Sequence, residues 1–276
     1  MRRMARRARS MTKRARVLTV LLTAVACGTV LLAPTKVGAA AFTHRLADPA
    51  PRQLPTVSRT GHAFGGVPAV GALFTVSAGA LGKHFCTASV VHSAHGDLAV
   101  TAAHCVAGNQ GQIVFVPGYA NGKEPYGTWQ VTAVYTDQAW QSAQNPDDDV
   151  AFLRLSGESD GVPVEDITGA ETLGTGGQEP ALVQVIGYPD GADQPVSCAN
   201  WTKIFSPTQL EFDCGGYADG ASGGPFLADV SAASGQGTVV GVIGGYEQGG
   251  DTPEVSYAAT FGAAATALYQ SAEAGG

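Results

Sequence analysis

Short apolar runs alternate with clusters of turn-forming residues from residue 64 to residue 262. The runs are rich in Val, Ile, Leu and Phe, and Gly, Pro, Asn and Asp stand between them. Runs of this composition and spacing are typical of an all-β sandwich or barrel. The pattern predicts strands at 70–76, 84–92, 97–102, 112–116, 128–135, 150–155, 181–187, 209–212, 238–244 and 255–261.

Two segments depart from this pattern. Residues 263–274 are rich in Ala, include Leu268 and Tyr269 and precede Gly275, which together predict a C-terminal helix. Residues 157–180 are Gly-rich and weakly apolar, and they suggest a joint between two barrels. We therefore expect a first barrel over residues 64–160 and a second barrel with the helix over residues 161–276.

The first 41 residues have a different character. Eight Lys and Arg residues lie within residues 1–16, an apolar stretch occupies 17–34, and small residues follow at 38–41. This order predicts a secretory signal over residues 1–41. A retained membrane anchor is an alternative, but the apolar stretch is shorter than the roughly 20 residues that a spanning helix prefers. Residues 42–63 are polar and lack apolar periodicity, so they are predicted to be a propeptide or linker.

Removal of the signal makes the chain strongly acidic. The whole chain has 16 Lys and Arg against 23 Asp and Glu, and residues 42–276 retain 7 against 23. An acidic chain is repelled by nucleic acid and by anionic membrane surfaces. No further apolar stretch is long enough to cross a bilayer. We expect a secreted, extracellular protein that binds neither nucleic acid nor membrane after the signal is removed.

The cysteines are consistent with an oxidising compartment. Four remain after the signal, an even number, and four cysteines allow three pairings among which spacing alone does not choose. They are Cys86, Cys105, Cys198 and Cys214. Cys27 could instead carry a lipid, but Ala24 is a poor residue three places before it, and the apolar run continues beyond it.

Three segments carry residues suited to nucleophilic catalysis. They are TAAHC at 101–105, DDDVAFL at 147–153 and GASGGP at 220–225. A serine nucleophile needs a base for its proton, an acid that fixes the imidazole tautomer, and backbone N–H donors for the developing oxyanion. Gly-x-Ser-x-Gly also fits the nucleophile elbow of α/β-hydrolases. That fold requires a His after the Ser, and no His follows His104.

His104, Asp149 and Ser222, in this order, resemble the catalytic residues of the trypsin/chymotrypsin-like serine proteases. TAAHC is close to that family's histidine signature, and GASGGP matches its serine signature except at one position. The resemblance covers roughly residues 64–262 and implies two perpendicular six-stranded antiparallel β-barrels with the site in the cleft between them. Asp149 is preferred to Asp147 and Asp148 because it directly precedes the apolar run at 150–155, as the family's Asp does.

The resemblance also implies roles for other residues. The N–H groups of Gly220 and Ser222 would form the oxyanion hole, and the disulfides would be Cys86–Cys105 and Cys198–Cys214. No cofactor is implied, and we expect a monomer. His92 and His95 have a spacing that could suit a metal, but no third ligand is evident, so no metal site is predicted.

One departure from animal trypsins shifts the resemblance toward exported bacterial members, including the glutamyl-endopeptidase-like group: Ala221 stands where animal trypsins carry the Asp that pairs with a newly cut N-terminus. Gly216 stands where trypsins carry the acid of the substrate pocket, which disfavours a Lys/Arg-selective pocket of the trypsin kind. Glutamyl endopeptidases use a pocket His after the Ser, which this chain lacks. The residues assigned to the substrate pocket are Gly216, Tyr217, Gly244, Gly245 and Tyr246, and the preferred substrate residue is left open.

The sequence thus predicts a secreted serine endopeptidase that acts on proteins or peptides. Ser222 attacks the peptide carbonyl, His104 transfers the proton, Asp149 orients the imidazole, and water releases the acyl-enzyme. Two alternatives remain: a protease-fold binding protein without turnover, and an esterase on the same fold. Reaction with a serine-directed covalent inhibitor would distinguish the endopeptidase from the binding protein. A comparison of peptide and ester turnover would distinguish it from the esterase.

Overall fold

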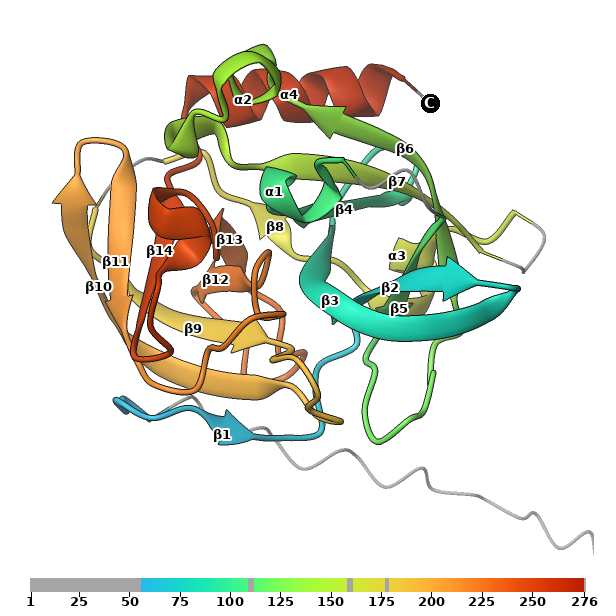
Figure 1. The fold of residues 1–276 in the computed structure, drawn as a ribbon, viewed down its shortest axis with the longest axis horizontal. Helices are drawn as coiled ribbons and strands as arrows, with labels where there is room; N and C mark the ends of the chain where they lie inside the picture. Colours follow the sequence, from blue (N-terminus) through green and yellow to red (C-terminus); the bar gives the residue numbers. More distant parts are fainter. Residues whose placement is uncertain (1–55, 109–111, 158–160, 177–178, 276) are drawn as a thin grey trace, which may run out of the picture. The chain divides into compact units, whose positions relative to one another are not determined.

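The computed structural model describes residues 56–275, apart from 109–111, 158–160 and 177–178 (Figure 1). The predicted signal and the first part of the predicted linker, up to residue 55, lie outside the described residues. All described residues belong to one unit, Pro49–Gly276.

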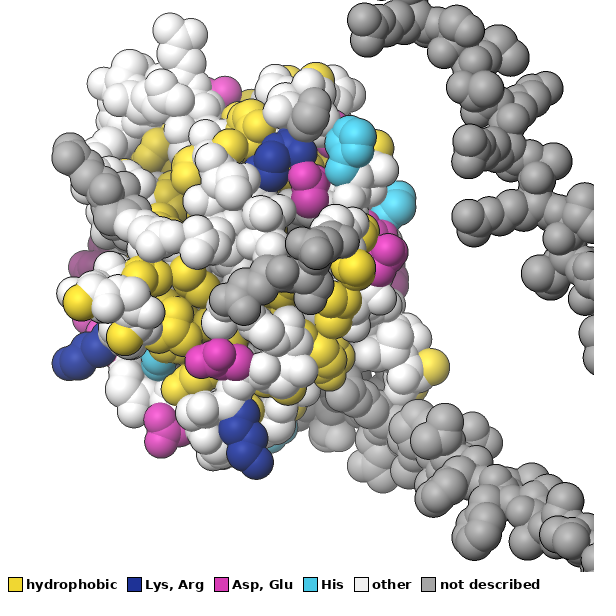
Figure 2. Space-filling model, turned by 90° about the vertical axis from the view of Figure 1, so that its right-hand side faces the viewer, with side chains coloured by type: hydrophobic (Ala, Val, Ile, Leu, Met, Phe, Trp, Pro, Cys, Tyr) yellow, Lys and Arg dark blue, Asp and Glu magenta, His cyan; other side chains and the backbone are white. Residues whose placement is uncertain are grey.

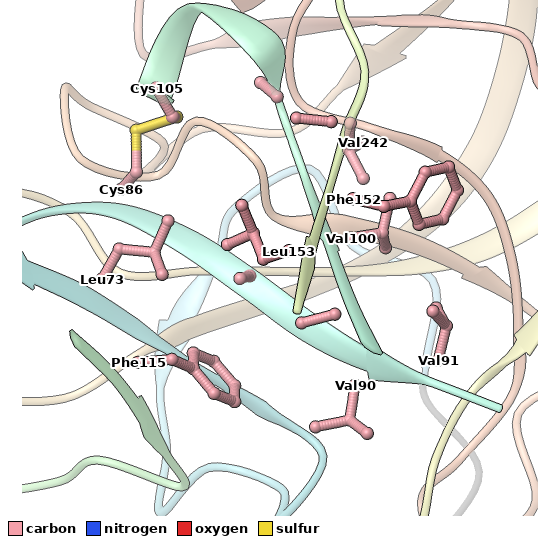
Figure 3. Packing of buried hydrophobic residues seen from close by; sticks show 14 of the residues in the cluster. Leu73, Cys86, Val90, Val91, Val100, Cys105, Phe115, Phe152, Leu153 and Val242 are labelled. Carbon is pink, nitrogen blue, oxygen red and sulfur yellow. A yellow bond between two sulfur atoms is a disulfide. The ribbon is translucent and has the colours of Figure 1, made fainter. Parts of the chain in front are cut away.

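Six strands close into the first barrel, in the order β2-β3-β4-β7-β6-β5, and neighbouring strands are antiparallel. Leu73, Phe115 and Leu153 point into its fully buried apolar core, shown in Figure 3. Glycine is required at Gly71, where the barrel closes, because a Cβ there would lie 2.2 Å from the carbonyl oxygen of Val116. The strands are β2 (Val70–Ser77), β3 (Ala80–Val91), β4 (Leu98–Thr101), β5 (Ile113–Pro117), β6 (Trp129–Thr136) and β7 (Ala151–Gly157).

The second sheet has the order β14-β11-β10-β9-β12-β13-β8, with β1 paired to β10. An antiparallel bridge between Ile243 and Ala258 joins β14 to the end of β13 and closes the second barrel. Phe212 and Phe226 lie in its core. The strands are β1 (His62–Ala63), β8 (Thr172–Leu173), β9 (Leu182–Gly187), β10 (Val196–Ser206), β11 (Gln209–Asp213), β12 (Pro225–Ala228), β13 (Thr238–Val242) and β14 (Val255–Ala259).

Every predicted strand is present, with ends that differ by a few residues. The sequence pattern missed the eleven-residue strand β10, in which polar and apolar residues do not alternate cleanly, and the four-residue strand β12 beside the Gly-rich motif. It also missed the two-residue strands β1 and β8.

One helix was predicted, and it is present as α4 (Ala263–Ala274). This helix follows the second barrel in sequence but packs on β6 and β7 of the first barrel (Figure 1). Arg154 on β7 donates to the carbonyl oxygen of Ala272, and Tyr269 donates to the carbonyl oxygen of His92 at 2.7 Å. The pattern missed the shorter helices, which are α1 (Ala103–Val106), α2 (Gln138–Ala143), η1 (Pro146–Asp148), α3 (Val164–Thr168) and η2 (Tyr246–Gly249).

The described end of the segment predicted as a propeptide or linker is hydrogen-bonded to the second barrel. Val57 and Thr60 form parallel bridges with Ala199 and Gly215, and β1 pairs with β10. Residues 57–63 are therefore built into the fold, although the segment has no apolar periodicity.

Figure 2 shows Lys and Arg separated from one another on the face that it presents, among polar and apolar side chains.

No helix in the described part of the chain has the length and apolar character needed to cross a bilayer.

Glu171 is fully buried where the two barrels meet. Its backbone bridges to Val91 at the end of β3, and its Oε2 accepts a hydrogen bond from the N–H of Gly237, just before β13. Its Oε1 has no partner among the described residues. Burial raises the pKa of this carboxyl to about 8, so the folded chain holds Glu171 protonated at neutral pH.

This carboxyl predicts a pH-dependent stability. The unfolded chain binds the proton with the ordinary pKa of 4.5, and the folded chain binds it with a pKa of about 8. The contribution of Glu171 to the free energy of unfolding is fully present below the pKa of the unfolded chain. It is lost as pH rises toward the pKa of the folded chain, by up to about 1.4 kcal/mol per pH unit. Urea denaturation of the wild type and of Glu171→Gln, which keeps the neutral shape, should give unfolding free energies that diverge across this window. Parallel curves would contradict the prediction.

Candidate active site

A cleft of about 710 Å³ is lined by residues from both barrels. The first barrel contributes Phe85, Cys86, His104 and Cys105. The second contributes the segment from Tyr217 to Ser222 and residues 247–253. His104 and Ser222, which are far apart in sequence, therefore face the same cleft.

His104 is hydrogen-bonded to the buried side chain of Asp149. His104 lies in α1, the short turn that follows β4, and Asp149 lies between η1 and β7. Asp149 Oδ2 is 2.7 Å from His104 Nδ1 and accepts the N–H of Gly245 at 2.8 Å, and its Oδ1 accepts the N–H of His104 at 2.8 Å. Asp149 is fully buried, and an ionised carboxylate at Oδ2 places the imidazole proton on Nδ1. Nε2 is then free to accept a proton.

Ser222 lies in a tight turn with two unused donors. Gly220 and Gly223 have φ values of 90° and 80°, which favour glycine. A Cβ on Gly223 would lie 2.1 Å from Thr101 Oγ1. The N–H groups of Ala221, Gly223 and Gly224 donate to backbone carbonyls, whereas among the described residues those of Gly220 and Ser222 have no acceptor. The turn therefore offers two N–H groups that could bind an oxyanion.

Thr87 on β3 holds this turn from the opposite barrel. Its N–H donates to the carbonyl oxygen of Ser222 at 2.7 Å, and its hydroxyl donates to the carbonyl oxygen of Gly220 at 3.2 Å. The same hydroxyl accepts the N–H of Tyr188 at 2.9 Å. Thr87 is fully buried, so these bonds are shielded from water. Sequence reasoning missed this residue, and its only signal was a polar side chain in an apolar strand beside Cys86.

Ser222 and His104 are not hydrogen-bonded to each other in the described structure. Nε2 of His104 lies 3.8 Å from Sγ of Cys105. The structure thus brings His104 and Ser222 to one cleft and joins His104 directly to the buried Asp149.

The other two acids of the predicted cluster have different neighbours. Asp147 is exposed and accepts hydrogen bonds from Thr208 and Gln209, and Asp148 accepts from the amide of Asn145. Gln209 also donates to the carbonyl oxygen of Pro146 and accepts the N–H of Tyr246. This buried side chain, which sequence reasoning missed, connects the loop before Asp149 to the segment after β13.

The residues predicted for the substrate pocket lie in several environments. Tyr217 lines the cleft, but its ring is buried in the second core and its hydroxyl donates to Val185 at 2.8 Å. Burial raises the pKa of this phenol. Gly244 and Gly245 lie against Asp149, and a Cβ on Gly244 would be 2.9 Å from Asp149 Oδ2.

Tyr246 lies outside the lining of this cleft. Its ring is partly exposed and packs against Phe205 and Tyr257, with centroid distances of 4.8 and 5.1 Å. The structure therefore does not place Tyr246 with Tyr217 in the lining of this cleft.

The chain has one disulfide at the cleft and one in the core of the second barrel. Cys86–Cys105 links β3 to α1 (Figure 3), and Cys105 directly follows His104 in the chain. Cys198–Cys214 links β10 to the segment that follows β11. These are the pairings that the resemblance implies.

The comparisons with known proteins agree with this architecture. The model of the trypsin-like peptidase domain matches residues 86–242, more than half of the chain. The protease Anisep from Arthrobacter nicotinovorans has a similar structure, with a TM-score of 0.65, 24% identity and coverage of 78% of this chain and 100% of that chain. No curated protein sequence matches the chain significantly.

Two further solved structures share the fold at lower identity. A Glu endopeptidase has a TM-score of 0.62 and 14% identity, and the match covers 79% of this chain and 99% of that chain. Human heparin binding protein has a TM-score of 0.58 and 16% identity, with 80% and 96% covered. The expected pair of chymotrypsin-like barrels with a short C-terminal helix is confirmed. The chain belongs to the trypsin-like peptidase domain family.

Proposed function

We propose that this chain is a secreted serine endopeptidase that cleaves proteins or peptides through Ser222, His104 and Asp149. One observation carries the proposal: the cleft that contains Ser222 and its two unused N–H donors also contains His104, whose Nδ1 lies 2.7 Å from the buried carboxylate of Asp149. Base, orienting acid and oxyanion donors are the parts that acyl transfer through serine requires.

The geometry supports the following sequence of steps. Asp149 keeps the proton of His104 on Nδ1, so Nε2 accepts the proton of Ser222 Oγ as this oxygen bonds to the scissile carbonyl carbon. The oxyanion is bound by the N–H groups of Gly220 and Ser222. When the C–N bond breaks, Nε2 gives the proton to the leaving amine. Water then attacks the acyl-enzyme, with His104 again as base, and Ser222 regains its proton. Hydrogen bonds between nucleophile and base are often long before substrate binds, which is consistent with the unbonded Ser222 and His104.

Export of the protein rests on the predicted signal at residues 1–41 and on the two disulfides. Disulfides persist in oxidising compartments, so extracellular location and structure are compatible.

Covalent labelling tests the proposed nucleophile. A fluorophosphonate should add once to the wild type and not to Ser222→Ala, as intact-mass spectrometry of the secreted protein would measure, because only an activated serine reacts rapidly. Absence of an adduct on the mature, disulfide-bonded wild type would reject the proposal and favour the binding-protein alternative. Labelling together with ester turnover, but without peptide turnover, would instead favour the esterase.

Thr87 gives a second prediction, since its hydroxyl fixes the turn that presents the oxyanion donors. Thr87→Val removes the bonds to Gly220 and Tyr188 and should lower kcat by about 10-fold to 100-fold with KM nearly unchanged, less than the 10²–10³ loss of a donor itself. Thr87→Ser retains the hydroxyl and should restore most of the rate.

Thr168→Val is the matched control for Thr87→Val, because Thr168 is also buried and its hydroxyl also donates to backbone carbonyls, but in α3. Steady-state kinetics and thermal melts of the three variants would be compared. Equal loss of kcat in Thr87→Val and Thr87→Ser would contradict the role of the hydroxyl.

A further inference from the structure

The backbone from Cys214 to Tyr217 connects β11 to the turn of Ser222 and reaches the cleft at Tyr217. One side of it is held by Pro253, whose carbonyl oxygen accepts the N–H groups of Gly216 at 2.9 Å and of Tyr217 at 3.2 Å. Gly216 has a φ of 111° and is the position at which trypsins carry the acid of their substrate pocket. This strip therefore contains two residues assigned to the substrate pocket, Gly216 and Tyr217, and it enters the cleft of Ser222 at Tyr217.

The other side of the strip is held by residues far away in sequence. The N–H of Gly215 donates to the carbonyl oxygen of Arg59 at 2.9 Å, and the N–H of Gly61 donates to the carbonyl oxygen of Gly215 at 2.6 Å. Both polar backbone groups of Gly215 are thus satisfied by one N-terminal segment. If these two groups were unpaired in a place without water, each would destabilise the fold by about the free energy of a lost hydrogen bond.

The same segment is anchored to β10. Upstream, the N–H of Ser58 donates to the carbonyl oxygen of Ala199 at 2.8 Å. Downstream, His62 and Ala63 pair with Ser197 and Val196. Residues 57–63 therefore run between a strand of the second barrel and the strip at Gly215, and we call them the N-terminal brace.

Gly61 makes the closest contact of the brace with the strip. A Cβ on Gly61 would lie 2.9 Å from the carbonyl oxygen of Gly215, and a Cβ on Gly216 would lie 3.7 Å from the Cα of Gly61. The two backbones pack directly against each other, so a methyl group on Gly61 must displace Gly215.

We propose that the N-terminal brace is a positioning element for the substrate pocket, which fixes Gly215 and Gly216 by main-chain hydrogen bonds. The inference rests on the proposed function and deepens it. The side chain of Ala221 has no carboxylate with which a newly cut N-terminal amine could form an ion pair. The brace orders the pocket by main-chain hydrogen bonds instead of by that ion pair. The brace consequently belongs to the catalytic unit, and a propeptide within residues 42–63 must end before Val57.

A matched pair of variants tests the proposal in the full secreted chain. Gly61→Ala inserts a methyl against Gly215, whereas the same change at Gly65 meets no atom within 4 Å. Gly61→Ala should lower kcat/KM for peptide substrates by about 10-fold to 100-fold and alter the preference among residues before the cut, because small misplacements of bound substrate are costly. Gly65→Ala should behave as wild type.

Labelling of Ser222 by a small fluorophosphonate separates a pocket effect from general damage. Gly61→Ala should be labelled within about twofold of the wild-type rate, since this reagent needs the nucleophile and the oxyanion donors but not a filled pocket. Equal losses of labelling and of peptide turnover would overturn the proposal, as would peptide kinetics that match those of the wild type.

Hydrogen exchange provides a readout that does not depend on activity. Amides of residues 214–217 should exchange at least about tenfold faster in Gly61→Ala than in wild type or Gly65→Ala, and unchanged exchange would overturn the proposal. If the fluorophosphonate does not label the wild type, the proposed function is rejected, while hydrogen exchange would still decide whether the brace fixes the strip.

If Gly61→Ala does not fold, Ser58→Ala replaces it. Ser58 Oγ bonds to the N–H and carbonyl of Thr60 within the brace, and its loss should shift exchange and kcat/KM in the same direction by about twofold to fivefold.

Discussion

The buried carboxylate of Asp149 is the constraint on which the site depends. An ionised carboxylate without water is tolerated only when protein donors replace its hydration. Asp149 has three: the N–H and Nδ1 of His104 from the first barrel, and the N–H of Gly245 from the second. The barrels can satisfy this group only in one relative placement, and that placement also sets the position of the imidazole. Gly244 is small for the same reason, because a side chain there would enter the space of the carboxylate.

A second set of cross-barrel bonds fixes the turn of Ser222. Thr87, from the first barrel, binds the carbonyl oxygens on both sides of Ala221. Within the second barrel, the N–H of Asp190 donates to the carbonyl oxygen of Asp219 at 2.5 Å. Donors that are already oriented need no reorganisation when charge develops, which is the main advantage of an enzyme site over water. The cleft is thus organised by contacts between the barrels before any ligand binds.

The sequence predicted those features that depend on residues close together in the chain. Apolar runs located the strands, Ala-rich composition located α4, and two short motifs together with one acid selected His104, Asp149 and Ser222. It did not recover Thr87, whose partner Gly220 is 133 positions away, or Gln209, which bonds across 62 positions to Asp147. The brace was also hidden, because main-chain pairing leaves no side-chain periodicity. Tyr246 was assigned to the pocket from the resemblance alone, and its contact with Phe205 could not be foreseen because the pattern did not predict β10.

The two ends of the described chain are exchanged between the barrels: the N-terminal brace pairs with the second barrel, and α4 packs on the first. Each half therefore carries an element of the other's structure, and both disulfides lie within a half, at Cys86–Cys105 and Cys198–Cys214. Between the described parts of the two halves, a proteolytic nick in the joint at 157–180 would sever the only covalent connection, but it would not remove this exchange. A nicked chain should accordingly remain one particle under native conditions, and separately produced halves are candidates for fragment complementation.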